Sequence, residues 1–270
     1  MKQNTIYRKI LLNRELGKKM FAVLIDPEKC NGRHLASMVA YLKISPPDFI
    51  FIGGSHISNS INNIIEVIKE EVDSSVVLFP GDASQFSDNA DALLFLSLTS
   101  GRNPDYLIGQ HIKSANIIKQ SEVEVIPTGY ILIEGGKLSS VEYISNTRAI
   151  PSDQIEIIKS TAIAGELLGM HLTYLEAGSG AIQPVSKDVI FRVHNSISTP
   201  LIVGGGIDSV EKMLNAYNAG ADIVVIGNTF EKDFSKVSEF VNAVKSYNNK
   251  EEGTHNNNNN ISYIHPDIIP

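Results

Sequence analysis

Polar residues follow several short apolar runs of the sequence, and these residues are of types that can do chemistry. Asp26 follows FAVLI, Glu176 follows LTYL, and Gly205 and Gly206 follow LIVG. A carboxylate such as Glu176 can accept a proton from a substrate hydroxyl, and Asp26 can ligate a metal ion. Backbone N–H groups in glycine turns can bind a phosphate without any side-chain charge. The residue types therefore predict a site for a phosphorylated substrate.

Two glycine turns late in the chain give the strongest local signal. GGGIDSVEKML places Gly205 and Gly206 before a helix expected from about Ser209, and Gly227 and Asn228 precede another helical segment. Free N–H groups in such turns and at helix N-termini bind phosphate. In eight-stranded barrels this site commonly follows strands seven and eight. The alternative is that these glycines only permit tight turns.

Asp26 and Ser55 are the candidate metal ligands. Asp26 ends an apolar strand and would point into the mouth of a barrel, while Ser55 follows the next strand. A Mg²⁺ ion that bridges protein and phosphate often uses one or two protein oxygens. Helix capping is the alternative for both residues. Asp82 is a weaker candidate for metal or diphosphate contact, and His56 has no second histidine at ligand spacing.

Glu176 is the candidate catalytic base. The segment YLEAGSG places it at the end of an apolar strand, beside a glycine loop that would help to enclose a phosphate. There it could accept the proton of a hydroxyl on the phosphate-bearing substrate. Tyr174 lies two positions earlier and faces the same side of the strand. It could hydrogen-bond the substrate or simply fill the barrel.

Eight apolar runs rich in Val, Ile, Leu and Phe would supply the strands that position these residues. Continuous apolar runs are typical of parallel strands that are buried on both faces. The predicted strands are 21–26, 48–53, 75–79, 92–98, 123–128, 172–176, 199–203 and 221–226. Helical patterns fill most of the gaps, and a helix near 4–19 precedes the first strand. We expect an α/β fold, a single (β/α)₈ TIM barrel with an N-terminal extra helix; an open doubly wound sheet is the less favoured alternative.

Three segments depart from the regular pattern. Between Gly81 and Ala92 the sequence is too short and polar for a full crossover helix, so the third helix is expected to be stunted. The long connection 129–152 could extend the fifth strand into a hairpin-like flap. The barrel is expected to cover 1–248, close to the roughly 250 residues typical of this fold. The Asn-rich tail, 249–270, is expected to be disordered.

Composition and charge limit the location and partners of the protein. The chain has 23 basic and 30 acidic residues and a formal net charge of −7, which argues against nucleic-acid or broad anionic-membrane binding. Its single cysteine, Cys30, excludes an internal disulfide and suits a reducing cytoplasm. No stretch approaches the roughly 18 apolar residues of a membrane span, and no targeting segment is evident. We therefore expect a cytoplasmic protein.

The motifs LIDPE, GGSH, LFPGD, YLEAGSGA, LIVGGGI and GADIVVIGN occur in this order. Together they resemble the geranylgeranylglyceryl phosphate synthase family, in particular its second group, which has archaeal and Bacteroidetes members. The resemblance covers roughly residues 8–240. It implies a Mg²⁺-dependent prenyltransferase of ether-lipid, and hence phospholipid, biosynthesis. The enzyme would join geranylgeranyl diphosphate to the 3-hydroxyl of sn-glycerol 1-phosphate and release diphosphate.

The resemblance also implies roles for individual residues. Asp26 and Ser55 correspond to the metal ligands. The substrate-binding positions correspond to Tyr174, Leu175, Glu176, Ala177, Gly178, Ser179, Gly180, Gly205, Gly206, Gly227 and Asn228. The first group of the family has a phosphate-binding lysine two positions before the metal aspartate. That position is Leu24 here, so the phosphate is expected to rely on backbone donors.

Other functions stay open at this point. The donor could be longer, such as heptaprenyl diphosphate, or the barrel could be a phosphate-binding isomerase or aldolase. The latter would need a catalytic lysine or a pair of strand-end acids, and no predicted strand ends in lysine. A barrel that only binds a metabolite would not require Asp26, Ser55 and Glu176 together. The expected partners are sn-glycerol 1-phosphate, a polyprenyl diphosphate, a membrane touched peripherally through the lipid product, and further copies of the chain in a homo-oligomer.

Overall fold

The chain forms a closed barrel of eight parallel strands. The computed structural model describes residues 5–30, 32–54 and 61–259, with side chains described as far as residue 250. Each strand pairs with its neighbours in sequence, and the last strand pairs with the first, so the sheet has no edge. The strands are β1 Met20–Ile25, β2 Phe49–Ile52, β3 Ser75–Leu78, β4 Ala92–Leu98, β5 Glu124–Leu132, β6 Leu172–Glu176, β7 Leu201–Gly204 and β8 Ile223–Ile226. This confirms the predicted TIM barrel and excludes the open sheet.

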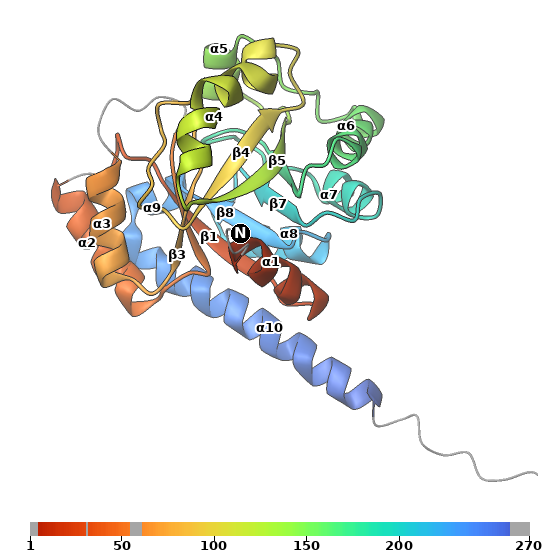
Figure 1. Cartoon of the computed structure of the whole chain (residues 1–270). Helices are drawn as coiled ribbons and strands as arrows, with labels where there is room; N and C mark the ends of the chain where they lie inside the picture. Colours follow the sequence, from red (N-terminus) through yellow and green to blue (C-terminus); the bar gives the residue numbers. More distant parts are fainter. Residues whose placement is uncertain (1–4, 31, 55–60, 260–270) are drawn as a thin grey trace, which may run out of the picture.

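Helices surround the barrel as an outer ring (Figure 1). The α-helices are α1 Thr5–Glu15, α2 Gly32–Ile44, α3 Asn62–Glu71, α4 Gln110–Gln120, α5 Ser140–Ser145, α6 Ile155–Leu167, α7 Lys187–His194, α8 Val210–Asn218, α9 Asn228–Lys232 and α10 Val237–Asn259. A π-helical turn, η1 Asp105–Gly109, leads into α4, and a 3₁₀ turn, η2 Phe234–Lys236, leads into α10. Among the described residues, no helix has the length and apolar character needed to cross a membrane.

Strand periodicity divides the apolar core into two layers. In β1, Phe21, Val23 and Ile25 pack against the surrounding helices. Met20 and Ala22 alternate with them and pack inside the barrel. Successive side chains of a strand point to opposite faces, so continuous apolar runs serve both layers at once.

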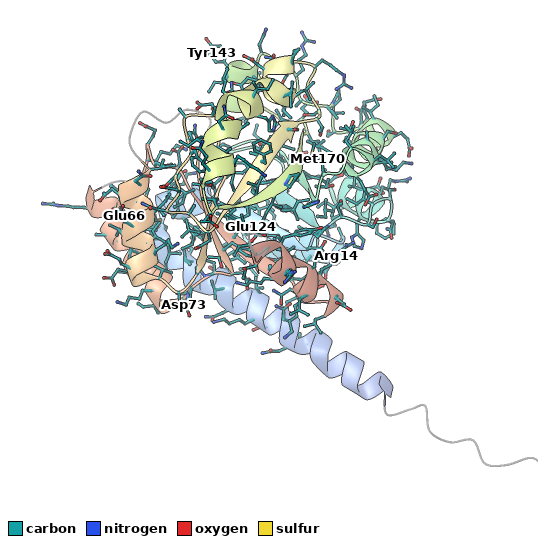
Figure 2. All side chains as sticks on the ribbon, in the orientation of Figure 1. Arg14, Glu66, Asp73, Glu124, Tyr143 and Met170 are labelled. Carbon is teal, nitrogen blue, oxygen red and sulfur yellow. The ribbon has the colours of Figure 1, made fainter. Side chains whose placement is uncertain are left out.

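The extra helix α1 closes the N-terminal end of the barrel. Ile6 and Ile10 pack into the inner layer of the core. The free backbone N–H groups of Ile6 and Tyr7 donate to the buried carboxylate of Glu124, at 2.7 and 2.8 Å. Figure 2 shows Glu124 beside α1. Because the first N–H groups of a helix have no partner within it, this carboxylate fixes α1 in place, and only the opposite end of the barrel remains open.

No helix connects β3 to β4, where a stunted one was expected; these connecting residues are all described. The chain between β3 and β4 forms turns. The Gln85 side chain accepts the N–H of Gly81 at 2.9 Å and donates to the carbonyl of Gly54 at 2.9 Å. A buried polar side chain thus satisfies backbone groups that a helix would otherwise pair. The outer ring has a gap at this point.

Of two other expectations, one is wrong and one stays untested. Strand β5 does extend to Leu132, but a short helix follows it and not a hairpin. That helix, α5, begins with a capping box between Ser139 and Glu142, in which two otherwise unpaired N–H groups are satisfied. The boundary expected between body and tail, after residue 248, falls inside α10, which continues to Asn259; the disorder expected of the tail stays a prediction. Residues 260–270 lie outside the described part of the chain.

Candidate active site

The carboxyl ends of the strands surround a hollow of about 610 Å³. Nine of the residues assigned to the site by sequence lie in its wall: Asp26, Tyr174, Glu176, Ser179, Gly180, Gly205, Gly206, Gly227 and Asn228. Leu175 and Ala177 do not, because their side chains pack in the outer layer against the helices. The other metal candidate, Ser55, and its neighbour His56 lie outside the described residues.

Strand β6 carries a buried carboxylate into this hollow. The Glu176 side chain faces the barrel interior with only 6% of its surface exposed. Its Oε1 atom accepts the backbone N–H of Gly178 at 2.7 Å. A Cβ atom placed on Gly204 would lie 2.7 Å from Glu176 Oε2 and 2.5 Å from the Tyr174 hydroxyl. The carboxylate and the hydroxyl therefore converge over a residue that must be glycine.

Burial changes the acidity of this group. Burial raises the pKa of Glu176 to about 7, while the N–H of Gly178 and the Tyr174 hydroxyl act to lower it. The Tyr174 hydroxyl is fully buried and has no hydrogen-bond partner within the described residues. It is close enough for its dipole to favour the Glu176 carboxylate. A carboxyl with a pKa near neutrality can both accept and return a proton at physiological pH.

The glycine turns after β6 and β7 pack directly against this carboxylate. Gly205 and Gly206 have φ angles of +81° and +69°, and Gly178 has +98°, a region that side chains other than glycine rarely adopt. A Cβ atom on Gly205 would lie 2.4 Å from Glu176 Oε1 and 2.8 Å from the Gly178 nitrogen. Bare backbone therefore lines this side of the hollow, as phosphate binding by N–H groups requires.

The turn after β8 completes the glycine-lined side. The Ser179 hydroxyl donates to Asn228 Oδ1 at 3.0 Å, which ties the loops after β6 and β8 together. Helix α8 begins after its N-cap, Ser209, as the sequence predicts. Gly227 lies against the backbone of Leu24. The predicted glycine loops after β6, β7 and β8 are thus brought together at one side of the mouth.

On the opposite side, Asp26 has two roles. Its Oδ1 atom accepts the N–H of Glu28 at 3.1 Å, which stabilises the turn after β1; the next helix, α2, begins only at Gly32, so this bond is not a helix cap. Its carboxylate nevertheless faces the hollow and Gly54. Lys29 Nζ lies 3.3 Å from Asp26 Oδ2 and 3.1 Å from Oε1 of Glu231 on α9. Sequence reasoning missed Glu231, although its place in the first turn of the helix after β8 was a usable signal.

The donor set fits a sparse metal site. The described residues contain no cluster of three or more His, Cys, Asp or Glu side chains that could hold an ion. Mg²⁺ that is shared with substrate phosphates needs only one or two carboxylates, and Asp26 is placed for this. Asp82 does not line the hollow. Its Oδ1 atom accepts instead from the N–H and hydroxyl of Ser84, at 2.7 and 2.6 Å.

A second, apolar cavity opens where no helix connects β3 to β4. It lies between the β3–β4 connection, β4 and α4, and its wall includes Phe86, Leu94 and Leu96. Phe79 and Tyr130 line both this cavity and the hollow at the mouth. The two spaces therefore adjoin, and the gap in the outer ring between β3 and β4 holds an apolar cavity.

The fold and the site define a (β/α)₈-barrel enzyme whose site lies at the carboxyl ends of its strands. Residues 14–245 match the PcrB family model, and the chain belongs to this family.

Its relatives include geranylgeranylglyceryl phosphate synthases. The one from Chitinophaga pinensis is 49% identical over 242 residues, which are 89% of this chain and 96% of that protein. The one from Saccharolobus solfataricus is 38% identical over 231 residues, covering 85% of this chain and 90% of that protein. The crystal structure of (S)-3-O-geranylgeranylglyceryl phosphate synthase from Thermoplasma acidophilum, in complex with substrate sn-glycerol-1-phosphate, superposes with a TM-score of 0.84 at 30% identity. That match covers 90% of this chain and 99% of the other.

Proposed function

We propose that this protein is a geranylgeranylglyceryl phosphate synthase. It joins geranylgeranyl diphosphate to the 3-hydroxyl of sn-glycerol 1-phosphate and releases diphosphate. The observation that carries the proposal is the junction of two unlike spaces: a glycine-walled hollow with a buried carboxylate adjoins an apolar cavity. A small phosphorylated acceptor suits the first and a polyprenyl chain suits the second. The relatives from Chitinophaga and Saccharolobus bear this activity in their names.

The acceptor phosphate binds at the loops after β6, β7 and β8. Backbone N–H groups of Gly205, Gly206 and Gly180 are the donors, because bare glycine backbone allows close approach. Ser179 and Asn228 hold these loops together through their hydrogen bond. Since the side chains of Leu175 and Ala177 face the helices, these two residues contribute through backbone alone. The solved Thermoplasma relative contains sn-glycerol 1-phosphate, which supports this acceptor.

Glu176 accepts the proton of the 3-hydroxyl. As the bond from the glycerol oxygen to C1 of the prenyl chain forms, the bond from C1 to the diphosphate oxygen breaks. The hydroxyl proton passes to the carboxylate, with Oε2 as the accepting atom because Oε1 already accepts the Gly178 N–H. A pKa raised to about 7 by burial makes the group a stronger base than an exposed glutamate. The Tyr174 hydroxyl and Oε2 both approach Gly204, and the hydroxyl favours the ionised carboxylate.

We propose Mg²⁺ as the cofactor, with Asp26 and Ser55 as its protein ligands. The ion would supply electrostatic stabilisation of the departing diphosphate. The Glu28 N–H and the Lys29 ammonium hold the Asp26 carboxylate at the mouth. The described residues offer no closed cage of ligands, which agrees with an ion that substrate oxygens complete.

The donor chain lies in the apolar cavity beside α4. The cavity occupies the gap left by the missing helix and is lined mainly by aliphatic and aromatic side chains, which favours burial of a hydrocarbon chain by about 0.8 kcal/mol per methylene. A longer donor, such as heptaprenyl diphosphate, remains the alternative substrate. A cytoplasmic homo-oligomer that touches the membrane through its lipid product also remains a proposal, and light scattering and vesicle sedimentation test its two parts.

A product assay tests the reaction. Purified protein is incubated with Mg²⁺, labelled sn-glycerol 1-phosphate and donors of 10, 15, 20 and 35 carbons. We expect the highest kcat/KM with the 20-carbon donor. The mirror-image acceptor, sn-glycerol 3-phosphate, is the control and should react far more slowly. Faster turnover with the 35-carbon donor would support the alternative substrate, and no ether product with any donor would refute the proposal.

A further inference from the structure

The described wall of the hollow has more carboxylates than cations. The carboxylates are Asp26, Glu176, Asp208, Glu231 and Asp233, and the cations are Lys29, Lys232 and Lys236. Lys29 is already paired with two of these carboxylates. Lys212, whose ammonium lies 2.9 Å from Asp208 Oδ1 and donates to the Gly206 carbonyl at 3.3 Å, is paired with a third. A phosphate dianion bound here would meet net negative charge, which backbone N–H groups offset only in part. A further cation near the glycine loops would resolve this imbalance.

Lys137 is placed to be that cation. Its Nζ atom lies 2.9 Å from the position that a Cβ atom on Gly180 would take, and Asn228 Nδ2 lies 2.9 Å from the same position. Two nitrogen donors therefore converge over the Gly180 backbone. The amide oxygen of Asn228 is occupied by the Ser179 hydroxyl, so its Nδ2 group remains for a ligand. Within the part of the chain that the structure describes, no carboxylate pairs with Lys137.

The loop that carries Lys137 is fixed to the loop after β6 on both sides of the lysine. The carbonyl of Gly135 accepts the N–H groups of Ile182 and Gln183, at 2.9 and 3.2 Å. On the other side, a Cβ atom on Gly178 would lie 2.9 Å from the Cβ of Ser139. Lys137 is an exposed residue, but its backbone is held within reach of the glycine loops. Packing therefore fixes the backbone on either side of Lys137, and the exposed side chain reaches over Gly180.

We infer that Lys137 is the side-chain cation of the acceptor phosphate site. Its ammonium and the Asn228 amide donate to phosphate oxygens of glycerol phosphate, in addition to the backbone N–H groups. The inference rests on the proposed function, because it assigns a contact to that substrate. Lys137 binds and positions the acceptor and takes no part in proton transfer. It supplies the charge that the apolar Leu24 does not.

The test compares three variants with the wild type. Lys137→Met removes the charge and keeps the length, Lys137→Arg restores a cation, and Lys119→Met removes an exposed lysine of α4 as a matched control. The dissociation constant of sn-glycerol 1-phosphate is measured by calorimetric titration without donor, and inorganic phosphate is titrated as a competing ligand. Steady-state assays give kcat and the KM of each substrate.

We expect Lys137→Met to weaken sn-glycerol 1-phosphate binding about tenfold, or about 1.4 kcal/mol, and to weaken inorganic phosphate similarly. At saturating acceptor, kcat and the donor KM should stay within about twofold, because lost ground-state binding changes KM alone. Lys137→Arg should recover most of the affinity, and Lys119→Met should match the wild type. Wild-type affinity in Lys137→Met, or an equal loss for the donor, would overturn the inference. If the wild type itself neither binds nor converts glycerol phosphate, the proposed function fails instead.

Discussion

Replacing Glu176 with glutamine separates its proposed role as a base from the role of its size and hydrogen bonding in the structure. Glutamine keeps the size of the side chain and can still accept the Gly178 N–H through its oxygen, but it cannot take up a proton. Loss of a general base typically slows turnover by about 10² to 10⁴. Because the pKa of Glu176 is raised to about 7, wild-type kcat/KM should fall about fivefold from pH 7 to pH 6 as the base is protonated. The variant should lack this acid limb.

The same variant has a second, independent readout in stability. Burial raises the pKa of Glu176 from an ordinary value of 4.5 to about 7, so the folded state binds this proton more tightly than the unfolded state. Its stabilising contribution is complete below pH 4.5 and is lost as the pH rises through 7. The difference corresponds to about 3 kcal/mol. Glutamine does not titrate, so Glu176→Gln should gain roughly 2 to 3 kcal/mol relative to wild type between pH 5 and pH 8.

The assays are kcat/KM across pH 5.5–8.5 for the acid limb, single-turnover rates at saturating substrates for the chemical step, and urea unfolding of the ligand-free protein at pH 5 and pH 8. Glu124→Gln is the matched control, because Glu124 is also a buried carboxylate but lies at the opposite end of the barrel, where it binds α1. The control should keep the acid limb of the wild type. A near-normal rate in Glu176→Gln, or an acid limb that survives in it, would refute the assignment of Glu176 as the base.

Three further changes test the other parts of the site. Asp26→Ala should reduce turnover to below about 1% and abolish Mg²⁺ binding in calorimetry, since it removes the carboxylate proposed to hold the ion. Its circular dichroism spectrum should match that of the wild type. Wild-type Mg²⁺ dependence would contradict that assignment. Gly205→Ala places a Cβ atom 2.4 Å from Glu176 Oε1 and should weaken acceptor binding at least about tenfold more than donor binding; Gly169→Ala, with φ +88° and open space around it, controls for backbone strain. Ala83→Trp fills the apolar cavity and should raise the KM of the 20-carbon donor about tenfold, while activity with a 10-carbon donor is kept. Mass spectrometry of the products measures both. An unchanged donor preference would place the prenyl chain elsewhere.

The barrel could be predicted from sequence because its signal is local and repeated eight times. Strand β4 covers the expected 92–98, and the other strands start within two residues of their predicted positions. Strand β5 runs four residues further than predicted, to Leu132. The sequence TGY resembles a turn, but Gly129 pairs with Thr173 of β6, and only the neighbouring strand makes this extension favourable.

The parts of the site that were predicted are those fixed by strand ends. Glu176 and the glycine turns lie where strand periodicity and barrel topology place them. The same periodicity indicates that Leu175, between two inward-facing residues, turns its side chain toward the helices. Glu231 and Lys137 reach the site from a helix and from the β5–α5 loop, and their positions depend on how those segments pack. For Lys137 no pattern within the sequence contains that information, whereas the place of Glu231 in the first turn of the helix after β8 was a usable signal.

Two buried glutamates in the described part of the barrel show how a structural carboxylate differs from a reactive one. Both oxygens of Glu124 accept backbone N–H groups of α1, so its burial is compensated and it holds a helix. Only one oxygen of Glu176 accepts an N–H. The other oxygen lies near the Tyr174 hydroxyl, which has no hydrogen-bond partner among the described residues. An incompletely solvated buried carboxylate lowers stability once it ionises. A structural role would favour a further donor at Oε2. Gly204 and Gly205 instead pack bare backbone against the carboxylate. Glu176 lies in the wall of the hollow, where the proposed substrate hydroxyl would supply the missing hydrogen bond and then its proton.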